Sequence, residues 1–120
     1  MIDLTKLASI TVLVVACGGA GMGADTRADV TKQMQSAQPT IQGCYADALK
    51  HNRKLRGMVS LEFIAEPGTG QFKNILIRRD ELNDPTVRQC ILDEVGKLKL
   101  DKPTKSAVSI PYPIRFAPTN

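Results

Sequence analysis

The stretch of residues 57–79 constrains the fold most, because it alternates, breaks and alternates again: GMVSLEFIAEPGTGQFKNILIRR. In 57–66 every second residue from Val59 to Ala65 is apolar, which is typical of a strand with one face on the core. Residues 67–70, PGTG, favour a turn. In 71–79 Phe72 and Ile75 differ in parity, which predicts a second strand with either a bulge or a late start. The stretch therefore predicts an antiparallel hairpin.

A helix is expected on each side of this hairpin. Apolar residues recur at steps of three and four over about 25–51, and Pro39 there predicts two segments or a kink. Gly43 costs this helix about 1 kcal/mol relative to Ala, and we expect it to allow close packing beside Cys44. Asp84 followed by Pro85 predicts the cap and first turn of the second helix. The first inner face would hold Val30, Met34, Ala37, Ile41, Cys44, Tyr45, Ala48 and Leu49, and the second Val87, Cys90, Ile91, Val95 and Leu98.

The alternating segment 107–116 predicts a third strand, which completes an α-β-β-α-β order. The fold class is α+β, with two helices on one face of a three-stranded antiparallel sheet and the first strand central. Hydrophobic residues make up 42% and aromatics only 4%, so the core is aliphatic. The other face of the sheet would be open to water or a partner, and it carries Ser60, Glu62, Lys73 and Arg115.

Pro111 and Pro113 lie two apart in this last strand, so both missing amides face the same side. Only an edge strand tolerates this, and two prolines hinder the addition of a further strand there. The second strand of the hairpin is the other candidate edge.

The N-terminus predicts export. Residues 1–16 fit a lipoprotein signal peptide, because Lys6 precedes a ten-residue uncharged run that is too short to span a membrane. The run ends in VVAC, which looks like a lipobox with Cys17 as the lipid acceptor. Residues 17–24 would be a flexible tether, and 25–120 the domain. We expect a cell-envelope location, at the outer membrane facing the periplasm rather than the inner membrane. The alternative is a buried N-terminal strand or helix.

The remaining cysteines, Cys44 and Cys90, lie on predicted inner helix faces that pack on one sheet. Export permits disulfides, so we expect these two to form one. The alternative is a pair of buried free thiols.

The segment from Ile41 to Pro118 resembles the AgmX/PglI C-terminal domain, a TonB C-terminal-like family of myxobacteria and relatives. The residues that carry the resemblance are Cys44, Tyr45, Leu49, Leu55, Gly57, Leu82, Asp84, Cys90, Tyr112 and Pro113. Family members often have aromatic residues where Leu98 and Leu100 stand, and a Pro in place of Arg53. The resemblance implies a binding or assembly module, found in gliding-motility and envelope proteins and in free lipoproteins, without catalytic residues.

Two functions follow as hypotheses. The first is a non-catalytic envelope lipoprotein that binds another envelope protein, in a motility or transport assembly. The second is a structural module that binds peptidoglycan or anionic lipid through basic loops; the net charge of +4 permits this but does not demand a nucleic acid partner. We expect no enzyme, cofactor or metal, since His51 is the only histidine and no catalytic motif is present. The candidate surface contacts are Lys50, Arg53, Lys54, Arg56, Arg78 and Arg79. The alternative, which we favour from the sequence, is that these basic residues are ordinary solvated surface.

Overall fold

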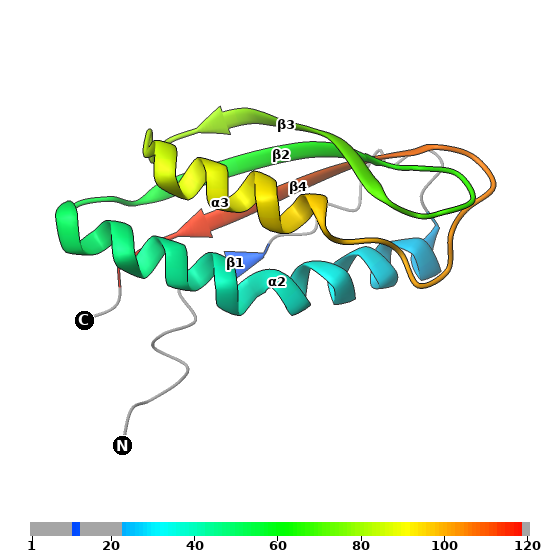
Figure 1. Ribbon diagram of the computed structural model, residues 1–120, viewed down its shortest axis with the longest axis horizontal. Coiled ribbons are helices and arrows are strands. Elements are labelled where there is room, and N and C mark those ends of the chain that lie inside the picture. The colour runs from blue at the N-terminus through cyan, green and yellow to red at the C-terminus, as the bar shows by residue number, and fades with distance from the viewer. Residues whose placement is uncertain (1–10, 13–22, 119–120) are drawn as a thin grey trace, which may run out of the picture.

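The predicted hairpin is the centre of the fold. Residues 11–12 and 23–118 are described by a computed structural model (Figure 1). Strand β2 spans Gly57–Ala65 and pairs antiparallel with β3, Phe72–Asp80. Gly68 and Gly70 both have positive φ in the turn between them, a conformation that glycine adopts without steric cost. Two register shifts in this pairing confirm that the second strand is bulged.

Strand β4, Val108–Phe116, pairs antiparallel with the other side of β2 along its whole length. The predicted three-stranded antiparallel sheet with the first hairpin strand in the centre is therefore confirmed. A two-residue strand β1, Thr11–Val12, adds antiparallel to the end of β4, so the full order is β1-β4-β2-β3. The rest of the predicted signal peptide and the proposed lipid acceptor Cys17 lie outside the described residues.

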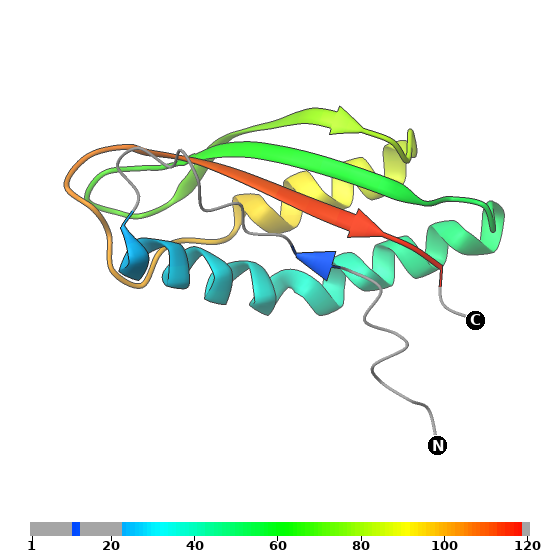
Figure 2. The same ribbon diagram turned by 180° about the vertical axis from the view of Figure 1, so that it is seen from behind.

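Both helices cover the same face of the sheet, as Figures 1 and 2 show from opposite sides. Helix α2 spans Ala24–His51 and α3 spans Pro85–Gly96. Their inner faces and the inner face of the sheet form one aliphatic core with a few aromatic rings. The residues that α2 buries are Val30, Met34, Ala37, Ile41, Tyr45 and Ala48, and α3 buries Val87, Ile91 and Val95.

Helix α2 is continuous through Pro39, so the expectation of two segments is wrong. A proline inside a helix costs about 3 kcal/mol through a lost hydrogen bond and a clash. Here Pro39 is exposed, and the buried stripe of α2 extends on both sides of it, from Val30 to Ala48. Most helical stability in proteins comes from tertiary packing of the apolar face, and this packing offsets the local cost.

Helix α3 begins as predicted. The Asp84 side chain accepts a hydrogen bond from the Val87 amide at 2.9 Å, and Pro85 occupies the first turn. The cap satisfies one of the amides that a helix start leaves without a partner.

Candidate interaction surfaces

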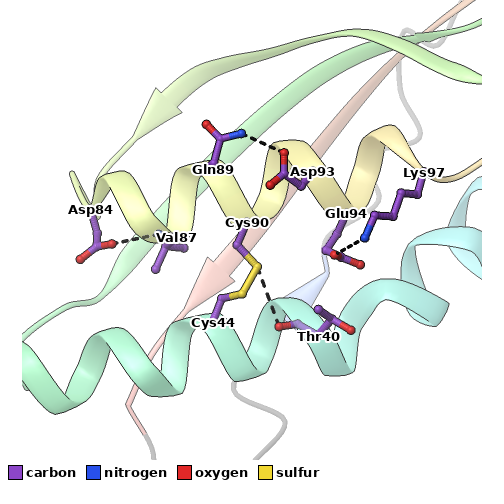
Figure 3. The surroundings of a disulfide bond; sticks show 9 residues. All are labelled: Thr40, Cys44, Asp84, Val87, Gln89, Cys90, Asp93, Glu94 and Lys97. Atoms are coloured by element: carbon purple, nitrogen blue, oxygen red, sulfur yellow. Dashed lines mark hydrogen bonds and ion pairs between the residues drawn. A yellow bond between two sulfur atoms is a disulfide. The ribbon is translucent and has the colours of Figure 1, made fainter.

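The two helices are joined by a disulfide between Cys44 and Cys90, as expected (Figure 3). Their Cα atoms lie 6.5 Å apart, within the range that disulfide geometry allows. Neither cysteine is fully buried, so both lie at the border of the helix interface rather than on the inner faces that the sequence predicted. The sulfur of Cys90 lies 4.0 Å from the Thr40 carbonyl oxygen. The bond therefore ties α2 to α3 at the protein surface.

The β4 edge carries the two prolines. Pro111 and Pro113 lie opposite Glu62 and Ser60 of β2, so their missing amides belong to the side of β4 that faces away from β2. Strand β1 pairs with Arg115 and Ile114, which come after both prolines. The pairing of β1 with the outer side of β4 thus lies beyond the two prolines.

The opposite edge, β3, has amides that point outward. A strand residue directs its N–H and C=O to the same side, and the side alternates along the strand. The Glu81 amide donates to the Met58 carbonyl at 3.0 Å, so the backbone groups of Met58 point toward β3. Those of Glu62 point the same way, because the two residues are separated by an even number of positions along β2. Glu62 lies opposite Leu76, which therefore directs its polar groups toward β2. Its neighbours Ile75 and Ile77 must then direct theirs away from the sheet.

The first residues of this outer side are already occupied. The Phe72 amide donates to the Leu98 carbonyl at 3.0 Å, and Gln71 forms a bridge with Lys99. Within residues 11–12 and 23–118, no strand pairs with the outer side of β3 beyond this point. The free edge therefore starts after Phe72.

The open face of the sheet is mixed in character. Leu76 is 52% exposed, the one large hydrophobic residue of the described chain that is so exposed. Around it, Lys73, Arg78 and Arg79 form ion pairs with the carboxylates of Glu66, Glu62 and Glu81. Ser60, Glu62, Lys73 and Arg115 are half-buried or exposed, as the alternation predicted. An apolar side chain between paired charges suits contact with a protein segment.

The connection between α2 and β2 is held from inside. Leu55 is buried, and its carbonyl accepts a 2.6 Å hydrogen bond from the hydroxyl of Tyr45, which is itself fully buried. Burial raises the pKa of Tyr45, while the charge of Arg56 opposes this. The Asn52 side chain accepts from the Lys54 amide at 3.0 Å. The connection is thus a turn held by hydrogen bonds. Its charged residues face outward because Leu55 faces inward.

The predicted surface contacts separate into two groups. Lys50, Arg78 and Arg79 form ion pairs with carboxylates, of which Asp47 pairs with Lys50. Arg53, Lys54 and Arg56 are exposed and form no ion pair in the described part of the chain. The sequence could not make this distinction, because the carboxylates that pair with Arg78 and Arg79 are set by strand register.

Two carboxylates help to hold connections in place. Glu81 accepts a 2.7 Å hydrogen bond from the Met58 amide, which, with the charge of Arg79, lowers the pKa of Glu81. Asp29 of α2 accepts the amides of Asp101 and Lys102, at 3.1 and 2.9 Å. Burial opposes the charged form of Asp29, but these bonds and that from Gln33 lower its pKa. Both carboxylates have a structural role.

In the comparisons, no family model, curated protein or solved structure matches this chain. None of the helices in residues 23–118 is long and apolar enough to cross a membrane. The function is therefore argued from the fold and from the surfaces described above.

Proposed function

We propose that this chain is a non-catalytic envelope lipoprotein whose TonB-C-like domain binds another envelope protein by accepting an extended segment along β3. The anchor would be a lipid on Cys17, and the assembly one of motility or transport. The resemblance to the AgmX/PglI C-terminal domain is part of this proposal.

One observation carries the proposal. The sheet has two long edges. The outward-facing residues Ile75 and Ile77 of β3 are free of proline, whereas the middle of the β4 edge is occupied by Pro111 and Pro113. Unpaired strand edges are templates for a further strand, and peptide recognition by strand addition uses such edges. The exposed side chain of Leu76 lies between these two residues and adds an apolar contact. The disulfide supports an oxidising location outside the cytoplasm.

Site-specific photo-crosslinking in the source cells tests the proposal. A photoreactive residue at position 76 should capture a protein partner. The same probe at position 109 of β4, which is also exposed on the open face and leaves both prolines in place, should not. Mass spectrometry of the same preparation should find a mature chain that begins with a lipid-modified Cys17.

The variant Ile77→Pro removes one outward amide and leaves the pairing of Leu76 with β2 in place. It should abolish the crosslink at position 76. Because Ile77 packs partly against the core, thermal unfolding must show that the variant is still folded. Equal capture at positions 76 and 109, or capture at position 76 that survives Ile77→Pro in a folded protein, contradicts strand addition at β3.

A further inference from the structure

The cations of this chain divide by whether they form ion pairs. Over the described residues, seven carboxylates pair with seven basic side chains, and these are Lys32, Lys50, Lys73, Arg78, Arg79, Arg88 and Lys97. Two groups form no such pair. One is in the connection from α3 to β4 and consists of Lys99, Lys102 and Lys105; the other consists of Arg53, Lys54, Arg56 and Arg115, which we name the basic end.

The basic end is gathered by the fold. Arg53, Lys54 and Arg56 follow the end of α2, and Arg115 lies opposite Met58, the second residue of β2. In Figure 1 this is the end where α2 stops, β2 starts and β4 finishes. All four side chains are exposed. The charge of Arg115 contributes to the lowered pKa of Glu81, but the ion-pair partner of Glu81 is Arg79.

The turn that carries these cations, residues 53–56, is held from inside and has no outward apolar side chain. Leu55, the only aliphatic residue between Arg53 and Gly57, is buried and held by Tyr45. A partner would therefore meet charge and hydrogen-bond donors, not an apolar surface to insert into. Three of the four cations are arginines, whose planar guanidinium groups bind phosphate oxygens in a bidentate manner.

We propose that the basic end docks on the headgroups of an anionic phospholipid membrane. Clustered like charges on a protruding turn fit a dense, flat array of phosphates, and each Lys or Arg near such a surface strengthens binding about five-fold. The sequence suggested binding to peptidoglycan or anionic lipid through basic loops. The present proposal limits the binding site to the four residues of the basic end and the ligand to lipid phosphate. It is independent of strand addition at β3, so either can fail alone.

Co-sedimentation of the full chain with vesicles tests this. The chain should bind vesicles of mixed phosphatidylglycerol and phosphatidylcholine, and binding should weaken as sodium chloride is raised. The triple variant Arg53→Gln, Lys54→Gln, Arg56→Gln should bind about 100-fold more weakly. The matched control, Lys99→Gln, Lys102→Gln, Lys105→Gln, removes the same charge from the other unpaired group and should bind nearly as the unmodified chain does.

Three results would overturn the proposal: equal loss in both triple variants, binding that salt does not weaken, or sedimentation with purified peptidoglycan but not with vesicles. Thermal unfolding should show that both triple variants are as stable as the parent, since the replaced side chains are exposed and form no ion pairs. The single variant Arg115→Gln, which leaves the turn unchanged, provides a second test and should weaken binding about five-fold.

Discussion

The two tyrosines show how differently one residue type is used in this core. Both are buried, at 0% exposure for Tyr45 and 2% for Tyr112. The hydroxyl of Tyr45 holds the Leu55 carbonyl, whereas that of Tyr112 has no hydrogen-bond partner among the described residues. Burial without a partner raises the pKa of Tyr112 to about 12.

The change Tyr45→Phe should lower the free energy of unfolding by about 1–3 kcal/mol, because it leaves the buried Leu55 carbonyl without a donor. The matched change Tyr112→Phe removes a hydroxyl that donates to nothing and should be neutral or slightly stabilising. Urea denaturation of both variants measures the difference. An equal effect of the two changes would mean that the Tyr45 hydrogen bond contributes nothing specific.

At the level of elements, helix α2 shows that packing of an apolar face can outweigh the local helix-breaking tendency of a proline. Its apolar periodicity predicted its extent almost to the residue, from 25–51 expected to Ala24–His51 observed. Of the two segments or a kink expected at Pro39, the division into two segments is absent, because the packed face extends on both sides of the proline. Gly43 is also not used as the sequence suggested: a Cβ placed there would meet nothing within 4 Å, so it does not serve close packing beside Cys44.

The variant Gly43→Ala should therefore stabilise the protein by about 1 kcal/mol, the difference in helix propensity between the two residues. Thermal unfolding should show a higher midpoint. Gly70→Ala provides the contrast, because Gly70 has φ +76° and a Cβ there would lie 3.0–3.1 Å from Leu100 atoms. That variant should be destabilised, and a loss of stability in Gly43→Ala would show a packing role for this glycine.

For the whole molecule, the disulfide joins two helices through cysteines that are 46 residues apart in sequence. In the loop-entropy view, a cross-link over this separation stabilises the fold by about 4 kcal/mol, a large fraction of the roughly 5–15 kcal/mol typical of a domain.

The double variant Cys44→Ser, Cys90→Ser should accordingly unfold at a much lower urea concentration than the parent. Reduction of the parent chain should reproduce this shift, because the lost cross-link is the same. The variant Cys17→Ser removes the third cysteine and should leave the midpoint unchanged. If neither the double variant nor reduction moves the midpoint, the disulfide does not contribute to stability as described.

The sequence by itself determined the elements and their order, because alternation, helical periodicity and the Asp84-Pro85 start are local patterns that each element carries within itself. It also identified the partner cysteines and the proline-bearing strand. Tertiary structure alone decided which backbone groups of β3 face outward and which cations remain unpaired. The outward groups of β3 and the ion pair of Arg78 depend on strand register, since a bulge at Arg78 places its side chain on Glu62. Arg53, Lys54 and Arg56 lie in the turn after α2, where they form no ion pair with a described carboxylate.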